Sequence, residues 1–193
     1  MHRLINIVII VGLALVGGGY SAWYAVQDHH GFGSIRIGLW TAWPLAGNVD
    51  ADPYTEAHVA REGTVPLGQA EGIAFFAGQD EAGDILLRQC NYLVSGRTPS
   101  SRLWTLAAIS PSQLPVPAIE GTPDGAFSST VVRNAGGDFE LAVGPRAAAG
   151  NWISTSGSGP FSLVMRLYDT PVTSSSGLVD PVMPTITKTG CLQ

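Results

Sequence analysis

An arginine and a tyrosine share one face of a regular strand near the end of the sequence, in the run FSLVMRLY at residues 161–168. Because successive side chains of a strand point to opposite faces, the alternating apolar residues from Phe161 to Leu167 take one face, and Arg166 and Tyr168 take the other. A guanidinium on a covered face needs a carboxylate or carbonyls of the protein, or else an anionic ligand. The sequence leaves two roles open for Arg166, a structural ion pair or a ligand anchor.

A short helix with marked ends carries the next candidate residues. Asp52 fits the N-cap, Pro53 fits the first helical position, and Gly63 can close the helix in the left-handed conformation. The residues three and four positions apart on one face of this helix are Tyr54, Ala57, His58 and Arg61. They form either a Tyr/His/Arg cluster or, as we favour, a helix on which Tyr54 packs against the sheet and Arg61 lies in water.

Acid–base chemistry would need carboxylates near these residues. The folded part of the chain offers Asp52, Glu56, Glu71, Asp80, Asp84 and Asp169. Catalytic carboxylate pairs keep no fixed sequence spacing, so the sequence alone does not select a pair. If the protein is an enzyme, we expect Arg166 and Arg61 to hold an anion while Glu71 or Asp52 acts as acid or base.

Motifs that mark particular reaction classes are missing from the sequence. It contains no G-x-S-x-G, H-E-x-x-H, P-loop or dinucleotide fingerprint. His58 is the sole histidine of the expected folded domain, which is a narrow basis for a hydrolase. The adjacent His29 and His30 have no third ligand nearby, so we expect no metal site, and nothing predicts a cofactor. No residue is assigned as catalytic, and we favour a protein that is not an enzyme.

The first residues form an apolar segment that can cross a membrane. Residues 4–26 carry no charge and, at about 1.5 Å per residue, extend about 34 Å as a helix, enough for the apolar core of a bilayer. A cleaved signal peptide is the alternative, because the glycines at 17–19 can end its helix. Tyr20 and Trp23 suit an interfacial belt and favour an uncleaved anchor. With Arg3 on the cytoplasmic side, we expect one pass through the inner membrane and a periplasmic domain.

Cys90 and Cys191 are the two cysteines of the chain, and there is no C-x-x-C motif. In an exported domain, an even pair indicates a disulfide rather than a metal or redox site. The bridge would tie the C-terminal tail to a strand in the middle of the chain and contribute about 4 to 5 kcal/mol in the chain-entropy model. Two separate buried thiols are the alternative.

The composition favours short strands joined by turns. The chain has 24 Gly and 13 Pro, and only 13% of its residues are charged, a mix that predicts a mainly β domain. The net charge is -5 and Lys188 is the single lysine, so a basic surface for phosphates is missing and we expect no nucleic-acid partner. We expect a membrane anchor at residues 1–27, a linker at 28–34 and a β-sandwich domain at 35–193.

Strand-like runs separated by turn signals recur along this domain. They are residues 35–43, 73–77, 85–95, 102–109, 127–133, 139–143, 152–154 and 161–168. Their spacing predicts an antiparallel β-sandwich, jelly-roll-like, with one short helix. The proline-rich residues 110–125 do not suit a sheet and predict a long surface crossing.

Several of these segments together resemble one bacterial family. They are DPYTEAHVAREGTVPLGQAEGIAFFAGQDEAGDILLRQCNYLVSGRTPSSRLWTLAAIS and GNWISTSGSGPFSLVMRLYDTP, within residues 35–175. The chain resembles the family catalogued as domain of unknown function 1214. The resemblance implies a jelly-roll-like sandwich and frequent association with a second uncharacterised domain, numbered 1254. It supplies neither a reaction nor catalytic residues. Because this sequence shows no such companion, an envelope protein carrying it would be a separate partner.

Two functions from different classes follow from these observations. The favoured one is an anchored envelope module that binds an envelope protein or a glycan, with aromatic residues such as Trp40 and Trp43 either on a contact surface or in the core. The alternative is an enzyme or enzyme subunit acting on a periplasmic saccharide or small acid. The candidate ligand-binding residues for either are Arg166, Tyr168, Arg61, Tyr54, Trp152 and Glu71.

Overall fold

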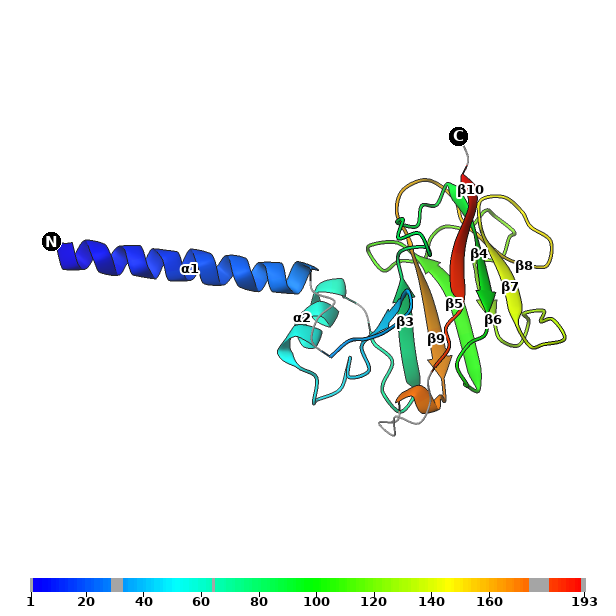
Figure 1. Cartoon of the computed structure of the whole chain (residues 1–193), viewed down its shortest axis with the longest axis horizontal. Coiled ribbons are helices and arrows are strands. Elements are labelled where there is room, and N and C mark those ends of the chain that lie inside the picture. Colours follow the sequence, from blue (N-terminus) through cyan, green and yellow to red (C-terminus); the bar gives the residue numbers. More distant parts are fainter. Residues whose placement is uncertain (1, 29–32, 64, 174–180, 192–193) are drawn as a thin grey trace.

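The structure is a computed structural model that describes residues 2–28, 33–63, 65–173 and 181–191. Its first element is the helix α1 (His2–Asp28), which projects away from the strands as a separate rod (Figure 1). Residues His2–Tyr24 of α1 form a helix long and apolar enough to span a membrane, and none of the residues in its apolar window is buried within the fold. A signal sequence would give the same helix, so length and composition leave both interpretations standing.

In the described part of the chain, ten strands form two sheets. The larger sheet has six strands in the order β1 (Ile35–Ile37), β2 (Trp40–Ala42), β3 (Gly72–Ala77), β9 (Ser162–Tyr168), β5 (Leu103–Ile109) and β6 (Gly125–Phe127). The smaller sheet has four, in the order β10 (Thr185–Cys191), β4 (Cys90–Gly96), β7 (Phe139–Gly144) and β8 (Asn151–Ser154). The mainly β class is confirmed, and the strand pairs are antiparallel as predicted except β7 and β8, which run parallel and make the smaller sheet mixed. The jelly-roll connectivity stays a prediction.

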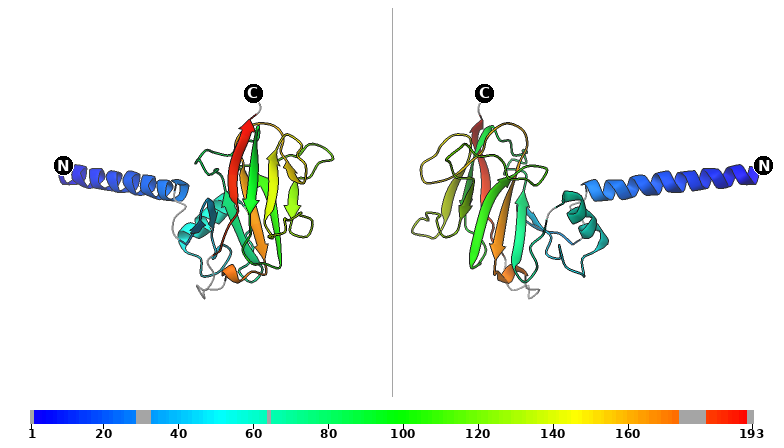
Figure 2. Two further views of the ribbon diagram at one scale, coloured as in Figure 1. Left: turned by 45° about the vertical axis from the view of Figure 1, so that its right-hand side comes forward. Right: turned by 180° about the vertical axis from the view of Figure 1, so that it is seen from behind.

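The hydrophobic core lies between the two sheets, which the two views of Figure 2 show as two layers. Alternate residues of each strand face inward, so one face of β9 contributes Leu163, Met165 and Leu167, all fully buried. Across the gap, the ring of Trp104 on β5 lies 5.2 Å from that of Phe139 on β7. The apolar face predicted for residues 161–168 is therefore the core face, and Arg166 lies on the opposite face.

The helix α2 (Pro53–Glu62) interrupts the chain between β2 and β3 and has the caps that the sequence predicts. One carboxylate oxygen of Asp52 accepts hydrogen bonds from the backbone N–H groups of Tyr54 and Thr55, at 3.0 and 3.2 Å. Gly63 closes the helix with φ of 63°, in the left-handed region. In Figure 1, α2 lies between α1 and the sheets, so the segment between β2 and β3, residues 43–71, forms an excursion on the side of α1.

Several expected strands have different bounds in the structure. The run 35–43 is a hairpin of β1 and β2 rather than one strand, because Gly38 with φ of 58° makes a tight turn. Residues 85–89 are a loop with isolated bridges, and the strand begins at Cys90. The prediction of a strand at residues 127–133 is also wrong, since β6 ends at Phe127. The pattern of the sequence did not indicate β10.

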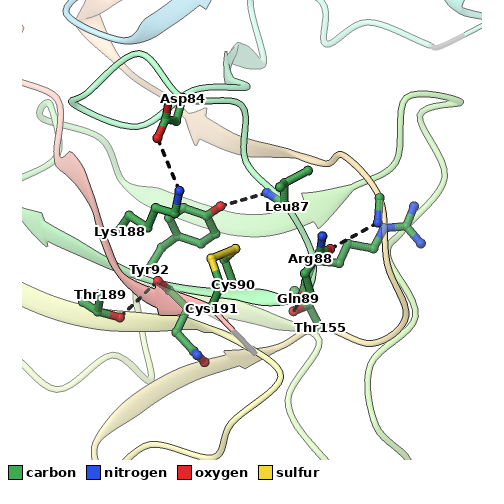
Figure 3. The surroundings of a disulfide bond; sticks show 12 residues. Asp84, Leu87, Arg88, Gln89, Cys90, Tyr92, Thr155, Lys188, Thr189 and Cys191 are labelled. Carbon is green, nitrogen blue, oxygen red and sulfur yellow. Dashed lines mark hydrogen bonds and ion pairs between the residues drawn. A yellow bond between two sulfur atoms is a disulfide. The ribbon is translucent and has the colours of Figure 1, made fainter. Parts of the chain in front are cut away.

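A disulfide joins Cys90 and Cys191, as the sequence predicts, and these two residues are register partners of β4 and β10. Figure 3 shows the contacts that order its surroundings. The hydroxyl of Tyr92 accepts a hydrogen bond from the backbone N–H of Leu87 at 2.8 Å, and Lys188 lies 3.3 Å from a carboxylate oxygen of Asp84. The C-terminal tail is thus attached to the middle of the chain covalently as well as by strand pairing.

Candidate functional site

The outer face of the six-stranded sheet carries the side chains that point away from the core. Opposite Arg166 on this face stand Ala74 of β3 and Thr105 of β5, both small residues. Val164, two residues earlier on the same face, is fully buried, so this face is partly covered. Arg166 itself is half-buried. The sheet therefore holds a guanidinium at its centre, beneath a partial cover.

A cavity of about 150 Å³ lies over this part of the face, and we call it the Arg166 cavity. Its floor is formed by Phe76, Arg166 and Tyr168 of the central strands. Its wall comes from the excursion at residues 43–71 and is mostly apolar, with Trp43, Val59, Val65 and Leu67. The cavity thus combines one cation and one phenol with a largely apolar wall, the usual composition of a small-molecule site.

The guanidinium of Arg166 has no carboxylate partner in this cavity. Among the residues that the structure describes, none forms an ion pair or hydrogen bond with it. Three other basic residues of the domain have ion pairs, Arg97 with Asp138, Arg102 with Asp169 and Lys188 with Asp84. The structural ion pair considered for Arg166 is therefore not formed with any described residue.

A second cavity of about 350 Å³ continues along the same face, and we call it the polar cavity. It shares Trp43, Phe76 and Gln113 with the Arg166 cavity. The polar side chains along it are Arg36, Thr41, Gln79, Gln113 and Ser162. The two cavities are neighbouring compartments of one depression that crosses β1, β2, β3 and β9.

Gln113 lies between the two compartments in an unusual backbone conformation. Its φ is 61°, a region that residues other than glycine seldom adopt, and such outliers gather at functional sites. A tight turn holds it there, since the backbone N–H of Gln113 donates to the carbonyl of Ser110 at 2.9 Å. The hydroxyl of Ser110 also accepts from the backbone N–H of Leu114 at 3.2 Å. The surface crossing at residues 110–125 therefore supplies part of the site.

The candidates on α2 do not join this site. Arg61 and Tyr54 are both exposed, and neither lines the two cavities. The side chain of His58, like the residues His29 and His30, lies outside the described part of the structure. Arg61 lies at the wet edge of the helix, and Tyr54 is 46% exposed. The Tyr/His/Arg cluster therefore stays a prediction, because it depends on the His58 side chain.

The two carboxylates suggested as acid or base have other partners. The carboxylate of Glu71 is exposed and accepts a hydrogen bond from the backbone N–H of Gly68 at 3.3 Å. Asp52 caps α2, where the Thr55 hydroxyl, at 2.5 Å, and two backbone N–H groups hold the pKa of its carboxyl below the usual value. Among the described residues, no three of His, Cys, Asp and Glu come together as metal ligands.

The suggested aromatic surface is not formed as one patch. Trp40 is buried in the core, where its indole N–H donates to the carbonyl of Pro184 at 2.7 Å. Trp152 lies on β8 of the smaller sheet, half-buried, and its indole N–H donates to the carbonyl of Gly144 at 3.0 Å. Trp43 alone of the tryptophans lines the Arg166 cavity, where its ring lies 6.0 Å from that of Phe76. Sequence reasoning missed Gln113, whose position depends on a loop fold.

A third hollow of about 490 Å³ lies beside Trp104, at one end of the sheets. The guanidinium of Arg133 covers the ring of Trp104, 5.7 Å from its centre. The indole nitrogen of Trp104 is buried and has no hydrogen-bond partner among the described residues. Because this nitrogen is shielded from solvent, a ligand in the hollow has no direct access to it.

The fold and this site can be compared with known proteins. Residues 71–172, more than half of the chain, match the family described as "Protein of unknown function (DUF1214)". The chain belongs to the DUF1214 family. The matched span of this DUF1214 chain includes β3, β5 and β9, and hence Phe76, Gln113 and Arg166 of the site. A comparison with curated proteins finds no match.

Two solved structures resemble the DUF1214 chain. The VPA0106 protein from Vibrio parahaemolyticus is 19% identical with a TM-score of 0.57, over 72% of this chain and 36% of that one. An uncharacterised protein from Burkholderia cenocepacia is 13% identical with a TM-score of 0.44, over 64% and 31% of the two chains. The first likeness shows a shared fold. The DUF1214 chain spans about a third of the length of either protein.

Proposed function

We propose that this DUF1214 chain is a binding module, not an enzyme, and that its Arg166 cavity holds the carboxylate of a small organic acid. The observation that carries the proposal is the half-buried residue Arg166, whose guanidinium has no hydrogen-bond or ion-pair partner among the described residues. A cation that is partly removed from water is stabilised by an anion, and a planar guanidinium matches the two oxygens of a carboxylate. Tyr168, from the same strand face, adds a hydroxyl that can donate to the ligand.

We favour binding over catalysis because the two carboxylates suggested as acid or base lie outside the Arg166 cavity. The carboxylates of Asp52 and Glu71 do not line the Arg166 cavity, and each has hydrogen bonds with the backbone of its own segment. A general acid or base must lie within hydrogen-bond reach of the substrate. We therefore propose that a small acid is bound by this protein as a ligand and is not converted as a substrate.

We place this module in the periplasm, held by α1 in the inner membrane, with residues 35–193 as the domain. The apolar helix supports the membrane anchor, and the Cys90–Cys191 bond supports an oxidising compartment. An envelope protein with the companion domain remains a proposed partner. The greater length of the VPA0106 protein fits a module that works beside a further domain.

Thermal unfolding of the full chain in detergent tests the proposal, because a ligand that binds the native state raises its melting temperature. The probes are short carboxylic acids, each compared with its neutral amide. We expect acids but not amides to raise the melting temperature, and Arg166→Gln to abolish the rise. Arg146→Gln, at an exposed turn beyond β7, is the matched control and should keep it. An equal rise in Arg166→Gln, or none with any acid, would refute the proposal.

A further inference from the structure

The polar cavity gives a ligand further space and further hydrogen-bonding groups beyond those of the Arg166 cavity. The linings of the two compartments have Trp43, Phe76 and Gln113 in common, so the polar cavity is the neighbouring space for any part of a ligand that reaches beyond the Arg166 cavity. The polar cavity is the larger, about 350 Å³ against about 150 Å³. A simple short acid would leave it filled with water. The side chains that line the polar cavity therefore indicate which chemical groups the rest of the ligand carries.

Those side chains are mostly neutral hydrogen-bonding groups. The hydroxyls and amides along the polar cavity are those of Thr41, Gln79, Gln113 and Ser162. None of these four side chains has a hydrogen-bond partner elsewhere in the described ranges of the chain. Each can both donate and accept, which matches hydroxyl groups, since these also do both. An alkyl chain would displace water from these groups without replacing its hydrogen bonds, which is unfavourable.

A second carboxylate fits the polar cavity less well than a set of hydroxyls. Arg36 is the one charged residue along it, and its side chain is exposed. Its Nε already donates to the carbonyl of Gly38 at 3.1 Å. A dicarboxylate would therefore meet one solvent-screened cation and leave four neutral side chains unused. A ligand with several hydroxyls uses all four.

Aromatic rings stand where the two compartments meet. The ring centres of Trp43 and Phe76 lie 6.0 Å apart and the ring planes are tilted by 59°, so the two rings are inclined to each other and are not stacked. Aromatic faces bury apolar C–H surface, which a sugar ring presents on its two faces while its hydroxyls point outward. Along the depression, Arg166 comes first, then the aromatic rings, then the polar side chains. A ligand with a carboxylate, a ring and several hydroxyls has its groups in the same order.

We infer that the ligand of this DUF1214 chain is a sugar acid, with its carboxylate on Arg166 and its hydroxylated ring in the polar cavity against Trp43 and Phe76. The inference rests on the proposed function, because it names the class of the acid that Arg166 binds. Gln113 is then the residue that selects a hydroxylated ring through hydrogen bonds of its amide, since it borders both compartments and its turn fixes it in place. The ligand combines the glycan and the small acid that the sequence left as separate possibilities.

Three probes of similar size separate the contributions of carboxylate and hydroxyls. They are methyl β-D-glucuronide, methyl β-D-glucoside and cyclohexanecarboxylate, titrated onto the full chain in detergent by calorimetry or saturation-transfer NMR. We expect the glucuronide to bind at least about 10-fold more tightly than either of the others, or about 1.4 kcal/mol. Gln79→Ala should weaken the glucuronide several-fold and leave cyclohexanecarboxylate unchanged. Gln113→Asn, which tolerates a positive φ, should also weaken the glucuronide several-fold.

Each outcome separates the two proposals. If cyclohexanecarboxylate binds as tightly as the glucuronide, and Arg166→Gln abolishes both, the sugar-acid inference is overturned and the proposed function stands. If the glucoside binds as tightly as the glucuronide, the carboxylate is irrelevant, and the role proposed for Arg166 falls together with the inference. Binding of neither acid also overturns both. Arg146→Gln should behave as the native protein with every probe.

Discussion

Arg166 of β9 lies directly opposite Ala74 of β3, so the guanidinium stands beside a methyl group at the centre of the sheet. A cation placed there for binding contributes little to folding, because no described residue repays its partial desolvation. We predict that Arg166→Met leaves the melting temperature of the full chain unchanged or raises it. The measurement is thermal unfolding without ligand.

Arg97→Met is the comparison for this variant. Arg97 forms an ion pair with Asp138 and donates to the carbonyl of Gly136 at 2.8 Å, yet it is exposed, so its loss should cost only up to about 1 kcal/mol. A loss of more than about 2 kcal/mol for Arg166→Met would assign Arg166 a structural role and contradict the prediction.

Gly72 at the start of β3 is expected to be intolerant of any side chain. A Cβ at this position would lie 2.0 Å from the carbonyl oxygen of Leu167, which is backbone and cannot move aside without opening the pairing of β3 and β9. We predict that Gly72→Ala destabilises the domain by about 3 kcal/mol or more, measured by urea unfolding. Gly68→Ala, whose Cβ would be 3.8 Å from the nearest atom, is the control and should be tolerated.

Loss of the disulfide should lower the free energy of unfolding by about 2 to 5 kcal/mol. Cys191→Ser is the cleaner variant, because Cys191 is exposed whereas Cys90 is 1% exposed. Reductant should destabilise the native protein by the same amount and leave Cys191→Ser unaffected. Equal stability of the oxidised and reduced native protein would show that the bridge does not constrain the unfolded chain.

The N-cap of α2 should make stability depend on pH in the acid range. The pKa of Asp52 is lowered in the folded state, chiefly by the hydroxyl of Thr55, so the ionised carboxylate stabilises the fold. This contribution is complete above the unfolded pKa of about 3.9 and is lost as the pH falls through the lower folded value. Asp52→Asn should remove that dependence in acid unfolding curves, while Asp50→Asn, at an exposed position, should retain it.

The location can be tested by a reporter that is active only after export. Alkaline phosphatase fused after Gln193 should be active, and deletion of residues 4–26 should abolish this activity. Carbonate extraction then distinguishes an anchor from a cleaved signal, because an anchored domain stays with the membrane pellet. An inactive fusion, together with two thiols that alkylate freely in the native protein, would contradict both the location and an oxidising compartment.

The sequence predicts the parts of the fold that local rules control. The caps of α2 follow from Asp52, Pro53 and Gly63, and the outward face of Arg166 follows from the two-residue period of β9. The hairpin of β1 and β2 was missed because an apolar alternation runs across its turn. The strand β10 was missed because its threonines and glycine have a weak apolar pattern, and its position depends on pairing with β4.

The candidate site was predictable only in part. Arg166 and Tyr168 could be found because one strand presents both side chains. Trp43 and Gln113 join them from segments 123 and 53 residues away from Arg166 in sequence, and no local pattern indicates that two loops meet over β9. The left-handed backbone of Gln113 is also set by its turn with Ser110, since glutamine carries no preference for it.

The bond between Cys90 and Cys191 also makes a closed ring of the second half of the chain, joining two residues that are 101 positions apart in sequence. A peptidase that cuts once inside this ring, for example after the exposed Arg146, leaves the two pieces covalently joined. The nicked protein would migrate on a denaturing gel near its intact size until a reductant is added. Release of a fragment that carries Arg166 and the tail therefore requires a second event, either another cut or reduction of the bridge.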